Sequence, residues 1–249
     1  ICVGGDGAFL DAVHKFGFPP VPFIGINTGH LGFFQEILPE QLDEFIFNYK
    51  QGKYSLQPLS TVKAEVVDGR ISGNDSSFSG SRTALRSGER KMSFVPETLE
   101  TAEFRALNEV LIKSAHSRSI HLNISIGGSF IERFSGDGIL VATSAGSTGY
   151  NYSLGGSIVD PRLKLLQVTP IAPMNTTAYR SFTSSILLPS DMTIGIIPES
   201  ENAELCVAVD GIEYKYDNKE INISMAETFV NLLRFEGYDF WNKVKTKFL

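Results

Sequence analysis

The chain has 249 residues, of which 42% are hydrophobic and 20% are charged, and these values are typical of an ordinary globular protein. They exclude a disordered chain, a collagen and a coiled coil. There are 22 basic and 28 acidic residues, which give a formal net charge of -6, and the sequence contains no run of Lys and Arg. A broad nucleic-acid-binding surface is therefore not expected. The length fits one large domain or two modest ones.

Cysteine content and hydropathy favour a cytoplasmic protein. Cys2 and Cys206 are the two cysteines of the chain, which is too few for a disulfide framework, and neither has metal-ligand spacing. No apolar run approaches the roughly 18 residues of a membrane span, and no signal segment opens the sequence. We therefore predict a reducing, cytoplasmic environment.

The first 52 residues predict a doubly wound α/β layer. Residues 1–3 read as the end of a buried strand, and because a chain rarely begins in mid-strand without Met, we expect a strand and a helix to precede it. Apolar residues at helical spacing predict one helix that ends at Gly17 and another from Pro39 to Gly52. The short apolar run at 23–26 predicts a buried parallel strand between them.

From residue 56 the apolar period changes from 3.6 to 2, which indicates short strands. We predict an α/β domain over residues 1–55 and a β-rich domain over 56–235, with a helix in 236–249 that packs back on the first domain. The Ser-rich segment 72–93 is expected to be a surface insertion. The expected strands of the second domain after the insertion are 106–113, 120–126, 130–134, 139–143, 186–188, 193–197, 205–209, 220–225 and 229–235.

The sequence Gly4-Gly5-Asp6-Gly7 lies where a strand passes into a helix. Bare glycines let the backbone approach a ligand closely, and a helix N-terminus offers N–H groups to phosphate. A carboxylate there would repel phosphate, so Asp6 has two explanations. It either caps the helix or meets a hydroxyl or metal-bound group at the reacting end of the phosphate.

Two further polar segments could carry chemistry. Gly136-Asp137-Gly138 could be a simple hairpin turn. The segment 143–150 that follows is harder to explain in this way, because its Gly, Ser and Thr residues supply hydrogen-bond donors and Tyr150 supplies a stacking face, and both suit a nucleotide. Asn108-Glu109 interrupts an apolar strand, where the ordinary explanation is a satisfied pair of core side chains.

Several familiar enzyme motifs are absent from the sequence. It contains no GxxxxGK[ST], no GxGxxG after a strand, no HExxH and no GxSxG. P-loop enzymes, Rossmann dehydrogenases, zincins and α/β-hydrolases are therefore excluded.

Five motifs together resemble the ordered set of the bacterial-type NAD kinases. They are Gly4-Gly5-Asp6-Gly7, residues 27–33, Asn108-Glu109, Gly136-Asp137-Gly138 and residues 143–150. The resemblance implies a phosphotransferase that uses ATP, or in some members polyphosphate, to phosphorylate the adenosine ribose 2'-hydroxyl of NAD and make NADP. It also implies Mg²⁺ bound with ATP rather than held by a metal-site motif, and a homodimer or homotetramer with no nucleic-acid or membrane partner.

The resemblance also assigns roles residue by residue. Asp6 matches the catalytic carboxylate, and Asp210-Gly211 is expected on the strand that completes the site. The NAD-binding positions are Gly7, Phe33, Asn108, Glu109, Asp137, Thr148, Gly149, Tyr150, Ser153 and Tyr179, and the phosphate-binding positions are Gly4, Gly5, Gly7 and Arg180. Some of these residues are expected to serve the pocket of a neighbouring subunit.

This sequence departs from the family pattern at Ala8 and Ser135, where Thr and a basic residue are common. Neither change removes a carboxylate. Two rival functions stay open at this point: another kinase with the Gly-Gly-Asp-Gly motif, acting on a lipid or a sugar, and a non-catalytic NAD(P)-binding protein.

Overall fold

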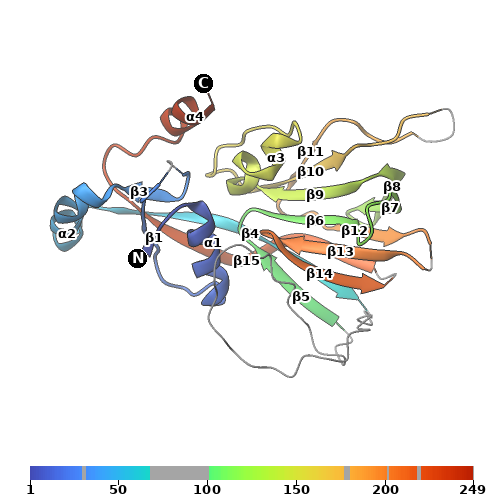
Figure 1. The fold of residues 1–249 in the computed structure, drawn as a ribbon, viewed down its shortest axis with the longest axis horizontal. Helices are drawn as coiled ribbons and strands as arrows, with labels where there is room; N and C mark the ends of the chain where they lie inside the picture. Colours follow the sequence, from blue (N-terminus) through green and yellow to red (C-terminus); the bar gives the residue numbers. More distant parts are fainter. Residues whose placement is uncertain (30–31, 68–100, 177–179, 201, 218–219, 249) are drawn as a thin grey trace. The chain divides into compact units, whose positions relative to one another are not determined.

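The computed structural model describes residues 1–29, 32–67, 101–176, 180–200, 202–217 and 220–248. The chain divides into two compact units (Figure 1). The first holds residues 1–61, 159–164 and 226–249, and the second holds 62–158 and 165–225. The first unit thus includes 56–61, 159–164 and 226–235, beyond the ranges predicted for the α/β domain. The predicted insertion at 72–93 lies outside the described residues.

The first unit is built on a small parallel sheet in the order β1-β2-β3. Its elements are β1 (Cys2–Val3), α1 (Asp6–Lys15), β2 (Gly25–Ile26), β3 (Gln35–Ile37), the 3-10 helix η1 (Pro39–Gln41), α2 (Leu42–Lys50) and α4 (Phe240–Phe248). Parallel strands need a crossover connection, and α1 provides it between β1 and β2. The predicted α/β region and the return of the last helix to it are confirmed.

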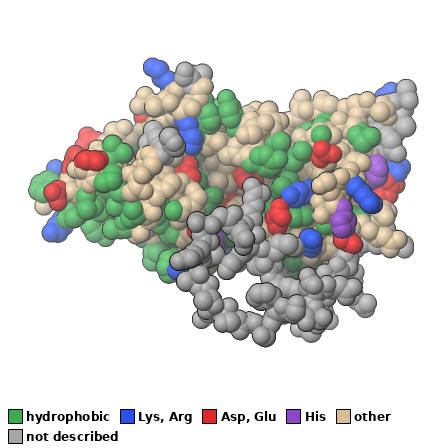
Figure 2. All heavy atoms as spheres, viewed as in Figure 1, with side chains coloured by type: hydrophobic (Ala, Val, Ile, Leu, Met, Phe, Trp, Pro, Cys, Tyr) green, Lys and Arg blue, Asp and Glu red, His purple; other side chains and the backbone are tan. Residues whose placement is uncertain are grey.

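Helix α1 presents Phe9 and Val13 to the interior, and the Phe9 ring stacks on Phe34 at 4.9 Å between centroids. Gly17, at φ +66°, follows the helix, as is common after a helix C-terminus. Phe16 lies outside this buried face, because it is the C-cap residue and is 65% exposed. In α2 only Phe45 is buried, and Figure 2 shows hydrophobic and charged side chains together on the surface over this helix.

The second unit contains most of two antiparallel six-stranded sheets, as predicted for a β-rich domain. One sheet has the order β11-β10-β9-β6-β13-β14 and the other β5-β4-β15-β12-β7-β8. The strands are β4 (Ser55–Val67), β5 (Thr101–Ala106), β6 (Glu109–Ser114), β7 (Ile120–Ile126), β8 (Ser129–Gly136), β9 (Gly138–Thr143), β10 (Leu165–Ile171), β11 (Ile186–Pro189), β12 (Ile194–Pro198), β13 (Glu204–Val209), β14 (Ile212–Asp217) and β15 (Glu220–Arg234).

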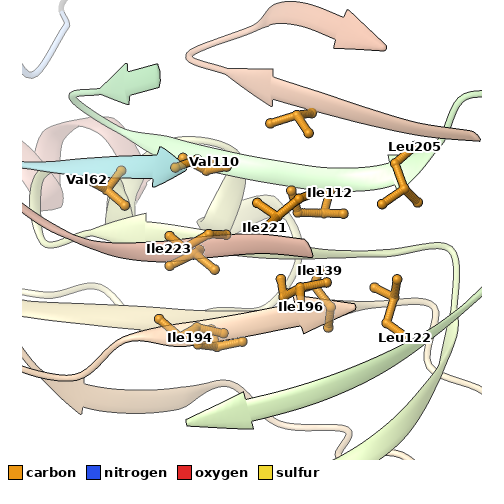
Figure 3. Close-up of a cluster of buried hydrophobic side chains, with 14 of the residues drawn as sticks. Val62, Val110, Ile112, Leu122, Ile139, Ile194, Ile196, Leu205, Ile221 and Ile223 are labelled. Carbon is orange, nitrogen blue, oxygen red and sulfur yellow. The ribbon is translucent and has the colours of Figure 1, made fainter. Parts of the chain in front are cut away.

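The two sheets share one apolar core, to which alternate residues of each strand contribute. Figure 3 shows Val110 and Ile139 from one sheet with Val62, Ile194 and Ile223 from the other. Each of these five side chains is fully buried, and such alternation is the expected pattern for a sheet with one covered face. Burial of this core stabilises the two sheets, and the candidate residues Asn108, Glu109 and 143–150 lie on or next to their strands.

The structure corrects several predicted elements. The predicted strand 106–113 corresponds to β6, which begins later, at Glu109, and the predicted strands 220–225 and 229–235 are one, β15. Strands β3, β5, β10 and β14 were not predicted. Asp137 was weighed as a hairpin turn, but β8 and β9 belong to different sheets, so this residue joins one sheet to the other.

No helix in the described part of the chain is long and apolar enough to cross a membrane. On the face that Figure 2 shows, Lys and Arg side chains are scattered among acidic ones rather than gathered into a patch.

Candidate active site

In the first unit, Asp6 is the first residue of α1, directly after the N-cap residue Gly5. Its carboxylate accepts hydrogen bonds from the backbone N–H of Phe33, at 3.0 Å to Oδ2, and of Phe34, at 3.1 Å to Oδ1. These donors lie 27 and 28 residues further along the chain. The carboxylate therefore fastens the segment before β3 to the start of α1, which helix capping alone does not explain.

Glycines at two positions allow close contacts around the start of α1. A Cβ atom on Gly32 would lie 2.1 Å from Asp6 Oδ1, and one on Gly4 would lie 2.7 Å from the Cβ of Ala8. Gly4 also has φ +141°, a conformation that favours glycine. Gly5 and Gly7 have no atom within 4 Å of a built Cβ, so at these positions the structure leaves open space beside the helix N-terminus.

In the second unit, Asp210 organises the chain around Asn108 and Glu109. Its carboxylate accepts hydrogen bonds from the N–H groups of Leu107, Asn108 and Glu109 at 2.7, 2.8 and 3.2 Å. Asp210 and Gly211 both have positive φ, +46° and +85°, as a two-residue hairpin turn requires. They form the turn between β13 and β14, so the expectation that they lie on a strand is wrong.

Glu109 lies in a desolvated position. Burial, followed by the nearby charge of Asp210, raises the pKa of its carboxyl to about 8. Asn108 Oδ1 and Glu109 Oε2 are buried and have no hydrogen-bond partner within the described residues. Buried polar atoms are normally paired, so these two oxygens are candidate acceptors for hydroxyl or amine groups of a ligand. The ordinary explanation, a satisfied core pair, does not fit them.

The small-residue segment 143–150 lies against this pair. Thr143 Oγ1 donates to the carbonyl of Leu107 at 2.6 Å and accepts from the N–H of Gly146 at 3.1 Å. A Cβ on Gly146 would come within 2.1 Å of the Asn108 carbonyl oxygen, and one on Gly149 within 3.4 Å of Glu109 Oε2. The absence of a side chain at Gly146 thus allows the segment to contact Asn108, and a Cβ on Gly149 would be at ordinary contact distance from Glu109.

Comparisons with known proteins decide the family. Residues 1–54 match the ATP-NAD kinase N-terminal domain, and residues 107–235 match the ATP-NAD kinase C-terminal domain. An NAD kinase of Finegoldia magna is 38% identical over 253 residues, covering all of this chain and 83% of that protein. One from Staphylococcus carnosus is 31% identical over 252 residues, with the same coverage of both chains. The chain belongs to the NAD kinase family.

Solved structures agree with this assignment. An NAD kinase from Archaeoglobus fulgidus, solved in complex with ATP, has a TM-score of 0.68 and 25% identity, covering 98% of this chain and 81% of that one. Yeast NADH kinase, solved with NADH, has a TM-score of 0.74 at 22% identity, and this chain spans 64% of its length; this second likeness supports the fold. The predictions of the family and of a phosphotransferase enzyme are confirmed.

The other expected NAD kinase site residues differ in their surroundings. Phe33 is buried and its ring lies 5.7 Å from that of Phe248. Thr148 belongs to the 3-10 helix η2 (Ala145–Thr148), and Tyr150 and Ser153 to the short helix α3 (Tyr150–Ser153) that follows. The side chains of Tyr150, Ser153 and Arg180 are exposed, whereas Tyr179 lies outside the described residues.

Within one chain, Asp137 is not brought to Asn108 and Glu109. In the antiparallel register of β6 and β9, Glu109 lies opposite Ala142 and Lys113 lies opposite Gly138, the residue after Asp137. Gly138 and Ala142 are four residues apart in β9, which is roughly 13 Å at the strand rise per residue. Asp137 lies one residue beyond Gly138, so it and Glu109 are at opposite ends of the β6–β9 pair. Asp137 lines a separate groove with Lys113 and Cys206.

Sequence reasoning missed the lysines near Asp6. Lys247, on α4, has its Nζ 3.7 Å from Asp6 Oδ2. One turn earlier, Lys243 donates to the carbonyl of Gln35 at 2.5 Å, and burial, followed by the charge of Arg234, lowers its pKa to about 8. The spacing of Lys243 and Lys247 on one helix face was the available signal, but nothing in the sequence indicates which segment that face meets.

Proposed function

We propose that this NAD kinase transfers the terminal phosphoryl group of ATP to the 2'-hydroxyl of the adenosine ribose of NAD, with Asp6 as the base. Polyphosphate is the alternative donor, and the enzyme acts in the cytoplasm. The observation that carries the mechanism is the placement of Asp6 at the first turn of α1, where two backbone amides fix its carboxylate. Phosphoryl transfer depends mainly on positioning and charge stabilisation, and a fixed carboxylate supplies the first of these.

The helix N-terminus explains how phosphate is held next to a carboxylate. The first N–H groups of an α-helix have no partner within the helix and attract anions. The N–H of Gly4 donates to the carbonyl of Ile26 at 2.9 Å, whereas Gly5 and Gly7 leave open space beside the first N–H groups of the helix. In the proposal these amides and Arg180 bind phosphate, while Asp6 accepts the proton of the hydroxyl that attacks.

The residues around Asn108 and Glu109 are proposed to bind NAD. The unpaired Asn108 Oδ1 and Glu109 Oε2 would accept hydrogen bonds from the adenosine half of NAD, whose hydroxyl and amino groups are donors. Tyr150 offers a stacking face, and Thr148, Gly149 and Ser153 complete this group. Gly7, Phe33, Asp137 and Tyr179 are proposed to contact NAD through their match to the family alone.

Mg²⁺ is the proposed cofactor. The described residues hold no group of three or more His, Cys, Asp or Glu side chains suited to a metal ion, while Mg²⁺ is commonly held by substrate phosphates with one or two carboxylates. The partly exposed oxygens of Asp6 are the right kind of donor for such an ion. When bound, Mg²⁺ neutralises charge on the phosphates; the orientation of the carboxylate comes from the chain itself.

The acceptor group can be tested with an NAD analogue. Wild-type protein is given ATP and Mg²⁺ with either NAD or 2'-deoxy-NAD, in which the adenosine 2'-hydroxyl is missing. We expect ADP formation with NAD alone, and the analogue should act as a competitive inhibitor because it still binds. Phosphorylation of 2'-deoxy-NAD at a rate near that of NAD would show that another hydroxyl is the acceptor.

A further inference from the structure

Helix α4 places a lysine beside the carboxylate of Asp6. Lys247 Nζ lies 3.7 Å from Asp6 Oδ2 and 4.6 Å from the centroid of the Phe33 ring. Phe33 is the residue whose N–H donates to the same Oδ2 atom. The ammonium group, the aromatic ring and the carboxylate therefore form one compact group within the first unit.

Orientation of Asp6 does not require this lysine. Both carboxylate oxygens already accept a backbone hydrogen bond, from Phe33 and from Phe34. The Lys247 side chain is 35% exposed and that of Asp6 28%, and an ion pair so open to solvent contributes little to stability. Neither the orientation of Asp6 nor the stability of the fold therefore explains why the Lys247 ammonium group lies at this position.

The chemistry of the ammonium group fits a different role. It has three N–H donors, and at 3.7 Å from Asp6 it retains capacity for a second anionic oxygen. A phosphoryl group that moves to a hydroxyl beside Asp6 carries negative charge on its peripheral oxygens. A cation close to that position stabilises the charge as it develops.

We propose that Lys247 is a second charged group of the phosphoryl-transfer centre and binds a peripheral oxygen of the transferred phosphate; this inference rests on the proposed function. In the step, the hydroxyl oxygen of the acceptor forms a bond to phosphorus while the bond from phosphorus to the leaving ADP oxygen breaks. The hydroxyl proton goes to Asp6. Lys247 keeps its protons throughout and acts by charge.

The same helix offers a matched control. Lys245 is exposed and lies two residues from Lys247, so it points to a different side of α4. We compare wild type with Lys247→Met, Lys247→Arg and Lys245→Met. Each protein is assayed for kcat of NADP formation at saturating NAD, ATP and Mg²⁺, for NAD affinity and for its thermal midpoint.

For Lys247→Met we expect a kcat at least about 10-fold lower, with NAD affinity unchanged within about twofold. Lys247→Arg should recover most of the rate because it keeps the charge, and Lys245→Met should match wild type. The thermal midpoint should move by no more than a few degrees, because the pair is exposed.

Three results would overturn the role of Lys247. The first is a Lys247→Met rate equal to that of Lys245→Met. The second is a Lys247→Met rate higher than that of wild type, which would show that the lysine restrains Asp6. The third is a Lys247→Arg protein that loses as much rate as Lys247→Met and has a lower thermal midpoint than wild type. Failure of the proposed function itself is distinguishable, because wild-type protein would then form no NADP.

Discussion

The carboxylates of Asp6 and Glu109 have contrasting surroundings that fit two different roles. Asp6 is partly exposed and receives one backbone hydrogen bond on each oxygen. Glu109 is desolvated, and its Oε2 has no partner among the described residues. A base needs access to the hydroxyl whose proton it accepts, whereas a buried unpaired oxygen gains most from a ligand that donates to it.

The raised pKa of Glu109 predicts how stability depends on pH. Its folded pKa of about 8 lies above the usual 4.5, so between these values the folded chain holds a proton that the unfolded chain releases. Stability is therefore lost as the pH rises through this window. Relative to Glu109→Gln, which cannot titrate, wild type should lose roughly 2 kcal/mol between pH 5 and 7.

Urea unfolding of both proteins at several pH values measures this difference. Glu103→Gln is a suitable control because Glu103 is exposed in a pair with Arg105. Parallel stability curves for wild type and Glu109→Gln would show that Glu109 does not hold its proton in the folded protein.

Gly146 is predicted to tolerate no side chain. A Cβ there would lie 2.1 Å from the carbonyl oxygen of Asn108, which is backbone and cannot rotate away. Gly146→Ala should destabilise the protein by about 1–3 kcal/mol as measured by urea unfolding. Gly29→Ala is the control, since no atom lies within 4 Å of a Cβ built on Gly29. Equal stability of the two variants would contradict the packing of 143–150 on Asn108.

Among the elements, those with clear periodicity could be predicted and those defined by distant partners could not. Helix α1 and strand β7 follow from apolar spacing in the sequence. The break between β5 and β6 comes from hydrogen bonds that Asp210 accepts about one hundred residues away, and local sequence carries no sign of them. β3 has three residues, too few for a periodic pattern, and its place depends on pairing with β2.

The candidate site shows the same limit. The motifs located Asp6, Asn108 and Glu109, because glycines and polar residues interrupt apolar runs there. They gave no indication that Phe33 and Phe34 would donate to Asp6, or that α4 would bring Lys247 to it. Such contacts depend on which surfaces pack together, which the residue types alone do not specify.

Strands β3 and β15 are joined by a buried ion pair. Arg234 donates to Glu36 at 2.6 Å and to Gln57 at 2.7 Å, and its guanidinium lies 3.7 Å from the centroid of the Tyr238 ring. The side chains of Arg234 and Glu36 are 6% and 7% exposed. Arg234→Met should cost about 3–5 kcal/mol of unfolding free energy, because it removes the nearest cation from the buried Glu36 carboxylate and leaves it with Lys243, whose Nζ lies 3.9 Å away.

The double variant Arg234→Met/Glu36→Leu should be less destabilised than Arg234→Met alone, since it removes both charges. Urea unfolding of Arg234→Met, Glu36→Leu and the double variant provides the comparison. A double variant whose loss equals the sum of the two single losses would show that the charges do not interact.

At the scale of the whole molecule, the proposed site residues belong to two groups in separate compact units, and Asp137 lies away from both Asn108 and Glu109 in its own chain. The family resemblance implies that some residues serve a neighbouring subunit. If Asp137 does so in a symmetric dimer, coexpression of Asp6→Asn and Asp137→Ala chains should restore activity, because half of the pockets in a mixed dimer contain both wild-type residues.

Random pairing would give about one quarter of the wild-type activity, measured as NADP formation by the purified mixture. Each variant expressed alone provides the control. A mixture no more active than the average of the two separate variants would place Asp137 outside the neighbouring pocket.

The central claim is that Asp6 accepts the proton of the NAD hydroxyl during phosphoryl transfer. The measurement that tests it most directly is single-turnover NADP formation from NAD, ATP and Mg²⁺ by wild type and Asp6→Asn, with NAD binding measured on both proteins. We predict a rate about 10²- to 10⁴-fold lower in the variant, with NAD affinity retained. An Asp6→Asn protein that forms NADP at the wild-type rate would contradict this role.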